Sequence, residues 1–507
     1  MKKPTLVLVL ILVLAPAQAG ADTTFRFRGG GWGHGIGLSQ YGAYGLAEKG
    51  WSRNDILTWY YAGTSVQAVD PPKDTYRVGL LQNRGSFTLT AQDAAFDFAL
   101  SSAPSDPIHS VGAGRTRRVV ISGGRYRIYD GDKLVGAFGD ADDHLLAIRR
   151  DGSRIKVEEW GYRVGRGRLQ FRIVSGARAH LVARVAAETY LYGLGEVPSS
   201  WPAKVLEAQA IAARSYADRI VASRSRESSC ACDIYASTRD QHYMGWDKEG
   251  GYLGERWVKA VDDTARRVVA ADGAPVITYY SASSGGWTEA VHRVWGGASR
   301  SYLRARCDPG DFTSANGNRT WSKELTGREA ASLLRARRGW GISRVTSISV
   351  LDRGPSGYVL KVRIRGRNAS GDAVSFTTSG EGLRSGLALK SARVWVNANR
   401  LVTGKIRSRY DSLRCRPGLA KSARTSTNGG VWQRFAKGRI YSKDDPGTHW
   451  VYGLVLRRYL DANGPRGSLG YPTTEVVRLS DGRLRTRFQN GVITCNPSTG
   501  RCSLKRT

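Results

Sequence analysis

Residues 196–223 read EVPSSWPAKVLEAQAIAARSYADRIVAS and carry the clearest helical pattern in the chain. Ser200 is a suitable N-cap, and the first turn of a helix tolerates Pro202. Apolar side chains then recur at helical spacing on one face: Leu206, Ala210, Ala213, Ala217 and Ile220. Because so many of the residues are alanine, we expect a buried helix with close packing on both sides.

One carboxylate, Glu196, directly precedes this helix among apolar neighbours that include Leu194, Val197 and Trp201. A helix N-terminus favours the charged carboxylate by roughly 0.3–1 kcal/mol. Desolvation favours the neutral acid and can shift a carboxyl pKa by several units. If desolvation dominates, Glu196 is protonated near neutral pH and suits general acid catalysis. The alternative is a solvated or capping glutamate.

The flanking sequence predicts an α+β fold. Residues 75–175 form short alternating runs broken by Gly, Asp and Asn, which indicate strands and hairpins. Further helices are predicted at 256–269 and 324–337, and further strands at 274–283 and 345–380. A polar stretch at 401–429 suggests a linker. A small repeat domain follows, in which FAKGRIY from Phe435 recurs as FQNGVIT from Phe488.

The first 19 residues predict a secretory signal. Two lysines precede a short apolar run, which ends in Ala17-Gln18-Ala19, an A-x-A cleavage pattern. The chain of 507 residues has 77 Lys and Arg against 43 Asp and Glu, a formal charge of +34. Since the cations are scattered and export is expected, anionic wall polymers are favoured over nucleic acid as partners. The alternative is an Arg-rich composition without a specific partner.

Six cysteines in an exported chain favour disulfides. Cys495 and Cys502 flank the turn-rich loop NPSTGR and are predicted to pair. Cys230 and Cys232 are too close to bond each other comfortably, so each is expected to have a distant partner. Alternatively, they could form a metal site with His242. Overall we expect no metal and no cofactor.

A glycine-rich stretch, FRFRGGGWGHGIGLSQYGAYG, spans residues 25–45. It fits neither a dinucleotide fingerprint nor a P-loop. Its glycines allow close backbone approach, and His34, Ser39 and Gln40 supply hydrogen-bonding groups for a sugar or polar polymer. A tight structural turn is the alternative. Ser283 and Ser284, in YYSASSGGWTE at 279–289, allow the same two interpretations.

These segments together resemble the SpoIID/LytB domain family. The motifs are EVPSSWPAKVLEAQAIAARSYA, SASSGGWTE, VWGG, GLRSGLALKS and GWGHGIGLSQYGA followed by GWSRNDILTWYYAGT. The resemblance implies a SpoIID-like core over 25–400. In typical members the glycine–histidine motif ends the domain, whereas here it opens it, so 25–66 would complete a circularly permuted core. Permutation predicts that a strand near 394–396 ends close to Phe25. The loop holding Glu196 looks shorter than in typical members.

The family includes peptidoglycan lytic transglycosylases and amidase enhancers. The resemblance therefore implies that Glu196 is catalytic in cleaving MurNAc–GlcNAc strands, and we expect His34 to share its cleft. The alternative is a non-catalytic glycan-binding enhancer of a cell-wall amidase. The expected substrate-binding residues are His34, Ser39, Gln40, Trp201, Gln209, Arg214, Ser283 and Ser284.

Residues 430–507, with GSLGYPTTE and FQNGVITCNPSTG, resemble LGFP repeats. This resemblance implies attachment to the envelope of a secreted, wall-associated actinobacterial protein. The expected partners are peptidoglycan glycan strands, anionic wall polymers and a cell-wall amidase, in sporulation or division. We expect no nucleic acid partner and no membrane-spanning segment after the signal.

Overall fold

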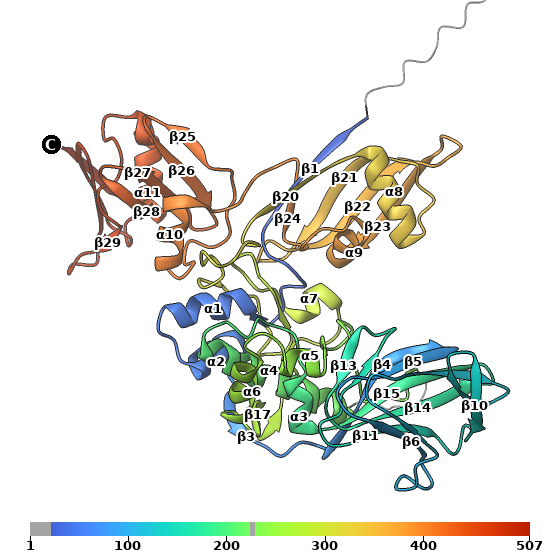
Figure 1. Cartoon of the computed structure of the whole chain (residues 1–507). Helices are drawn as coiled ribbons and strands as arrows, with labels where there is room; N and C mark the ends of the chain where they lie inside the picture. The colour runs from blue at the N-terminus through green and yellow to red at the C-terminus, as the bar shows by residue number, and fades with distance from the viewer. Residues whose placement is uncertain (1–21, 224–228) are drawn as a thin grey trace, which may run out of the picture.

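The computed structural model describes residues 22–223 and 229–507, with the parts arranged as in Figure 1. The predicted signal at 1–19 lies outside the described residues. The α+β prediction is confirmed, because strands form several separate sheets and helices pack beside them. In the part of the chain that is described, no helix has both the length and the apolar character needed to cross a membrane.

Two packed sheets hold the predicted strand region. The seven-stranded sheet has the order β16 (Ile234–Tyr235), β4 (Thr75–Arg84), β15 (Arg178–Ala186), β14 (Arg168–Ser175), β11 (Leu145–Arg149), β6 (Phe96–Leu100) and β7 (His109–Val111). The six-stranded sheet has the order β10 (Lys133–Phe138), β9 (Arg125–Asp130), β8 (Thr116–Ser122), β5 (Ser86–Ala91), β12 (Ile155–Val157) and β13 (Tyr162–Val164). Phe87 of β5 packs edge-on against Phe171 of β14, with ring centroids 5.3 Å apart, and so joins the two sheets.

The predicted buried helix is confirmed as α4 (Ala203–Ser223), and Ala208, Ala210 and Ala213 are fully buried. The helix begins at Ala203, three residues after Ser200, and Pro202 directly precedes its first residue. Short elements surround it: β2 (Leu38–Ser39), α1 (Gln40–Glu48), α2 (Arg53–Tyr60), β3 (Ser65–Ala68), α3 (Ala187–Tyr192), α5 (Trp246–Glu249), α6 (Gly254–Asp262), β17 (Arg267–Ala271), β18 (Ala274–Pro275), β19 (Tyr280–Ser281) and α7 (Val291–Trp295). The helix predicted at 256–269 is therefore too long, since it ends at Asp262 and β17 pairs with β3.

The start of the described chain is a central strand. β1 (Thr24–Gly29) lies between β20 (Trp321–Thr326) and β24 (Val394–Val396), and Phe27 is opposite Val396. The predicted proximity of 394–396 to Phe25 is confirmed. A second core follows from α8 (Gly327–Arg338), β21 (Arg344–Arg353), β22 (Val359–Arg367), β23 (Ala373–Ser379) and α9 (Gly380–Gly386).

The C-terminal module contains the predicted repeat. Its elements are α10 (Gly404–Ser412), β25 (Thr425–Thr427), β26 (Gly430–Phe435), β27 (Gly438–Lys443), β28 (Gly447–Val451), α11 (Gly453–Asp461), a 3-10 turn (Gly464–Arg466), β29 (Val477–Arg478), β30 (Leu484–Phe488), β31 (Gly491–Cys495) and β32 (Cys502–Arg506). Each repeat forms a tight hairpin, with Phe435 opposite Gly438 in one and Phe488 opposite Gly491 in the other. The two stretches that are similar in sequence therefore form the same kind of hairpin.

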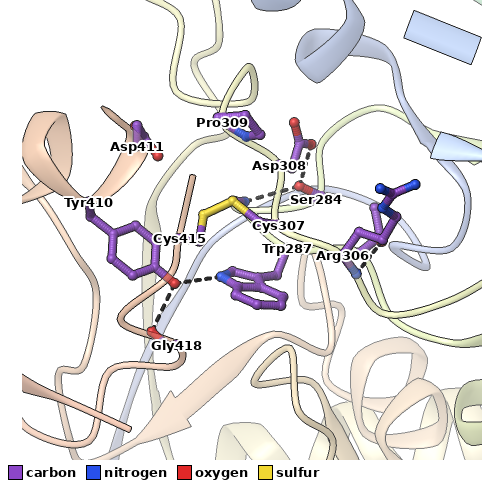
Figure 2. Close-up of a disulfide and its surroundings, with 12 residues drawn as sticks. Ser284, Trp287, Arg306, Cys307, Asp308, Pro309, Tyr410, Asp411, Cys415 and Gly418 are labelled. Atoms are coloured by element: carbon purple, nitrogen blue, oxygen red, sulfur yellow. Dashed lines mark hydrogen bonds between the residues drawn. A yellow bond between two sulfur atoms is a disulfide. The ribbon is translucent and has the colours of Figure 1, made fainter. Parts of the chain in front are cut away.

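The linker predicted at 401–429 is not an open linker. It contains α10, and Cys415 forms a disulfide with Cys307 of the core (Figure 2). Tyr410 accepts a hydrogen bond from Trp287 Nε1 at 2.7 Å and stacks on Phe435. Low apolar content concealed this junction because only a few apolar residues of the segment, among them Val402, Ile406 and Ala420, are buried together with the disulfide.

The other cysteines give one confirmation and one correction. Cys495 and Cys502 form the predicted disulfide. Cys230 and Cys232 bond to each other, contrary to the expectation of distant partners. Ala231 between them has a φ of 50°, and this left-handed turn brings the two Cα atoms to 5.0 Å. The alternative metal site is also wrong, because neither thiol is free.

Replacing Cys307 and Cys415 by serine should strongly lower the free energy of unfolding. Their 108-residue separation gives a loss of about 4–5 kcal/mol in the chain-entropy model. The matched control replaces Cys495 and Cys502, whose separation is only 7 residues, and should lose about 2–3 kcal/mol. Guanidinium unfolding of the full chain measures both. Equal losses of unfolding free energy in the two double variants would contradict the interpretation that the Cys307–Cys415 disulfide is a major constraint on the fold.

Candidate functional site

Glu196 lies in the turn between α3 and α4 and is only partly exposed. Its Oε1 atom accepts hydrogen bonds from the backbone N–H of His242 at 2.7 Å and from the Tyr280 hydroxyl at 3.2 Å. Within the described residues, its Oε2 atom has no hydrogen-bond partner. One oxygen is thus held by the protein while the other remains free to transfer a proton.

Burial raises the pKa of Glu196 from its ordinary value of 4.5 to about 7. The hydrogen bonds from His242 and Tyr280, and the charge of Lys248, lower this pKa but do not cancel the effect of burial. Of the two competing effects at this carboxylate, desolvation is the larger. Glu196 is consequently present in both protonation states near neutral pH, as a group that gives and regains a proton requires.

The Tyr280 hydroxyl is oriented by a buried amide. Gln241 Nε2 donates to the Tyr280 oxygen at 2.8 Å, and Gln241 Oε1 accepts from Tyr190 at 3.0 Å. Because the Tyr280 oxygen already accepts a hydrogen bond, its hydrogen is directed to Glu196. Sequence reasoning noted the motif around Tyr280 but singled out only its serines.

The loop around His242 supports Glu196 from the other side. Gly195 N–H donates to the His242 carbonyl at 2.8 Å, and Met244 N–H donates to the Gly193 carbonyl at 2.7 Å. Buried Lys248 donates to the Val197 carbonyl at 2.6 Å, and burial lowers the pKa of its ammonium group to about 8. His242 was expected only as an alternative metal ligand, and Lys248 was not anticipated, because pairing between these distant loops leaves no local signal.

The glycine-rich stretch contacts the Glu196 turn directly. Gln40 Nε2 donates to the Glu196 carbonyl at 3.2 Å and to Gln209 Oε1 at 3.3 Å. Both glutamine side chains are buried. Gln40 and Gln209 therefore position the turn in this structure, which brings together segments more than 150 residues apart.

His34 lies on the same stretch and is partly exposed. Its ring packs against Trp295 at 4.9 Å and Tyr279 at 6.3 Å, and Tyr279 adjoins Tyr280. Burial lowers the His34 pKa to about 4, so the imidazole is neutral at neutral pH. Nδ1 accepts from the Ile36 N–H at 3.0 Å, which assigns the proton to Nε2 as a donor. The cleft shared by His34 and Glu196 stays a prediction.

Gly35 shows why glycine is needed beside His34. Its φ is +69°, and a Cβ there would overlap the Tyr358 hydroxyl. Any other residue would therefore be strained and would displace the loop.

The three serines expected to bind substrate are buried instead. Ser39 caps α1 by accepting the Gly42 N–H, and it donates to Asp311 at 2.9 Å. Ser283 donates to Asp311 at 3.0 Å and has no exposed surface. Ser284, equally buried, donates to Asp308 at 2.7 Å. We revise the expectation: these hydroxyls satisfy buried carboxylates and hold the glycine-rich stretch against residues 279–289.

Asp308 and Asp311 form the centre of that network. Burial raises the pKa of both carboxyls, and the neighbouring Asp308 helps to raise that of Asp311 to about 7. Tyr60 also donates to Asp308, at 2.7 Å. Since buried carboxylates are tolerated only with hydrogen-bond donors, this network depends on all the hydroxyls around it.

Arg214 is a support rather than a surface contact. It is buried and makes a two-point ion pair with Glu188 of α3, with nitrogen–oxygen distances of 2.9 and 2.8 Å. It also donates to the carbonyls of Arg267 and Val261. These contacts hold α3, the helix before the Glu196 turn, whereas the burial of Arg214 does not favour the expected contact with substrate.

Aromatic side chains supply the exposed surface of this region. Trp201 is partly exposed and packs against Tyr41 at 5.0 Å and Tyr44 at 5.3 Å. Trp32 is 51% exposed and Trp295 is 45% exposed. Flat apolar faces with polar edges are suited to contact with polar ring-shaped ligands.

Fold and site together define an α+β domain with one partly buried carboxyl group, joined to a small repeat module. Residues 175–270 match the model of the family described as Stage II sporulation protein, SpoIID, and residues 418–467 match the LGFP repeat. The chain thus carries SpoIID-family sequence together with an LGFP repeat, and the resemblance predicted from its motifs is confirmed. The LGFP match begins within the segment predicted as a linker.

Three relatives were found among characterised and uncharacterised proteins. The amidase enhancer of Bacillus subtilis is 29% identical over 208 residues, which cover 40% of this chain and 27% of that protein. An uncharacterized protein of Brachyspira hyodysenteriae is 31% identical over 118 residues, 23% of this chain and 30% of that protein. Stage II sporulation protein D of Bacillus amyloliquefaciens is 23% identical over 262 residues, 46% of this chain and 75% of that protein. The chain therefore spans less than a third of the first two relatives. These matches support a function related to the cell wall.

The raised pKa of Glu196 predicts a pH-dependent stability. The folded chain keeps this proton up to pH about 7, whereas the unfolded chain releases it near 4.5. Its contribution is thus complete below pH 4.5 and is lost as the pH rises through about 7. As the pH rises from 4.5 to about 7, the free energy of unfolding of the wild type should fall by on the order of 2–3 kcal/mol relative to that of Glu196→Gln. Urea unfolding at several pH values measures the difference, and a pH-independent difference would contradict the shift.

Proposed function

We propose that this chain is an exported peptidoglycan lytic transglycosylase, which cleaves MurNAc–GlcNAc strands and leaves 1,6-anhydroMurNAc ends. The observation that carries the proposal is the environment of Glu196. Burial raises its pKa to about 7, two donors hold Oε1, and Oε2 has no partner within the described residues. The SpoIID match around this residue adds support, since residues 175–270 include the Glu196 turn.

The chemistry requires only one carboxyl group. Protonated Glu196 would donate to the glycosidic oxygen while the bond from that oxygen to C1 of MurNAc breaks. The Glu196 carboxylate would then take the proton of the MurNAc C6 hydroxyl, whose oxygen bonds to C1 and closes the anhydro ring. Glu196 ends protonated, so no water or cofactor is consumed. Typical glycosidases need a second carboxylate because their nucleophile does not come from the substrate.

Three of the expected substrate contacts keep roles in this proposal. His34, with a neutral ring and a donor at Nε2, would hydrogen-bond a sugar hydroxyl. Trp201 would pack against a sugar ring. Gln40 would act through the Glu196 turn, because its amide group donates to the Glu196 carbonyl.

Substituting Glu196→Gln should abolish anhydro-muramoyl products and leave binding to walls unchanged. A loss of about 10²–10⁴ in rate is expected for a general acid. Mass spectrometry of peptide-stripped glycan strands digested by the full chain measures the products, and a wall pulldown measures binding. The matched control is Glu255→Gln in the first turn of α6, which makes the same substitution at an exposed glutamate outside the hydrogen-bond network of Glu196. Normal cleavage by Glu196→Gln would refute Glu196 as the acid.

Substituting Tyr280→Phe should move the alkaline limb of the cleavage pH profile upward. The Tyr280 hydroxyl favours ionised Glu196, so its loss raises the pKa of the acid. A net hydrogen bond of about 1 kcal/mol corresponds to a shift of roughly 0.7 pH unit. Tyr279→Phe is the control, because the Tyr279 hydroxyl bonds to no described residue. A downward or absent shift in Tyr280→Phe would contradict this role.

The similarity to the amidase enhancer of Bacillus subtilis favours a second candidate function. In this alternative, the chain binds glycan without cutting it and stimulates a cell-wall amidase. The digestion of peptide-stripped strands, combined with an amidase assay on walls that keep their stem peptides, separates the two functions. Intact glycan strands, with wall binding retained and amidase activity increased by the added chain, would support the enhancer and exclude the enzyme.

A further inference from the structure

A pocket of about 560 Å³ lies where the core meets the C-terminal module, well apart in sequence from the Glu196 turn. On the side of the core, the pocket is lined by Trp287, Arg353, Trp395 and Arg400. On the side of the module, it is lined by Cys415 and by three cations, Arg416, Lys421 and Lys437. The proposed cleavage uses none of these residues.

The lining is strongly cationic. It contains three arginines and two lysines and no aspartate or glutamate. Within residues 22–223 and 229–507, none of these five cations forms an ion pair with a carboxylate. Arg400, Arg416, Lys421 and Lys437 are exposed, so they are available to a ligand. Such a concentration of unpaired charge creates a positive potential that attracts anions.

Arg353 has no acidic partner in the described part of the chain, and its guanidinium donates instead to the carbonyls of Gly357 and Val394. Burial, together with the like charges of Arg393 and Arg400, lowers the pKa of this guanidinium to about 10. The Trp395 ring accommodates part of this charge, since the Arg353 and Arg393 guanidinium carbons lie 5.2 and 5.1 Å from its centroid. The pocket thus contains a preformed arginine–tryptophan cluster without an acidic partner.

The two sides of the pocket are fixed relative to each other. Cys415 is bonded to Cys307, and Tyr410 bridges the sides by accepting from Trp287 and donating to the Gly418 carbonyl at 2.9 Å (Figure 2). Arg407 of α10 also stacks on Phe312 of the core, 3.5 Å from its ring centroid. Ordering costs on binding are therefore small, because the site is already assembled.

We propose that this pocket binds a phosphate-bearing unit of an anionic wall polymer. Arginine guanidinium groups match phosphate oxygens with paired hydrogen bonds. The four exposed cations suit the repeated charges of a polyanion better than a single carboxylate, and the partly exposed Trp287 ring suits the sugar or polyol between the phosphates. The inference goes beyond the proposed cleavage and does not depend on Glu196.

Binding of soluble poly(glycerol phosphate) to the full chain tests the proposal by calorimetry at fixed salt. The double variant Arg400→Gln, Lys437→Gln should bind at least about tenfold more weakly, because it removes two charge-assisted hydrogen bonds to phosphate. The matched control, Arg487→Gln, Lys505→Gln, removes two exposed cations of the last sheet and should change binding by less than about twofold. Equal weakening in both variants would overturn the pocket in favour of diffuse attraction.

Three further arms identify the ligand and separate this inference from the enzyme proposal. Inorganic phosphate should compete only weakly, and equally tight binding of inorganic phosphate would overturn the polymer assignment. The binding of duplex DNA of equal charge should not depend on Arg400 and Lys437. If the double variant also weakens DNA binding, the polymer assignment is wrong. Glu196→Gln should bind poly(glycerol phosphate) as the wild type does, so loss of cleavage and loss of polymer binding are distinguishable.

Discussion

The insertion of β1 between β20 and β24 is the pairing on which the site depends. These strands come from residues 24–29, 321–326 and 394–396, so the sheet closes a loop through most of the core. The glycine-rich stretch begins within β1, and the pairing therefore places the rest of it beside residues 279–289 and the Glu196 turn. A chain whose opening strand were unpaired would leave Gln40 and His34 without a defined position.

Desolvation of one carboxyl group, balanced by a few donors, gives the candidate site its chemical character. Without the N–H of His242 and the hydroxyl of Tyr280, burial would shift the pKa of Glu196 still higher. With more donors it would remain ionised. A raised pKa is not enough to make a carboxyl group reactive, because burial also raises the pKa of Asp308 and Asp311, and neither has any exposed surface. Partial exposure, rather than the pKa alone, distinguishes Glu196 as a group that can act on a ligand.

The module at the C-terminus is part of the same rigid design. Figure 1 shows it beside the core, and the Cys307–Cys415 disulfide joins the two. A module on a flexible linker would be free to turn relative to the core. This module is held by a disulfide and by stacked side chains, so the pocket between the two parts keeps a fixed direction relative to the core.

The sequence by itself determined the elements that have a local signal. Apolar spacing predicted α4, alternation predicted the strands from Thr75 onward, and the recurrence of the Phe435 stretch at Phe488 predicted a repeat. The apolar neighbours of Glu196 indicated desolvation as one of two competing effects, and the structure decided between them. Only the tertiary structure decided which side chains surround this carboxyl group. Tyr280 and His242 reach it through pairings between distant loops, Ser283 and Ser284 turn inward to buried aspartates, and Cys307 finds Cys415 across 108 residues. Local patterns report burial and periodicity, whereas long-range pairing depends on how whole elements pack, and no short stretch of sequence contains that information.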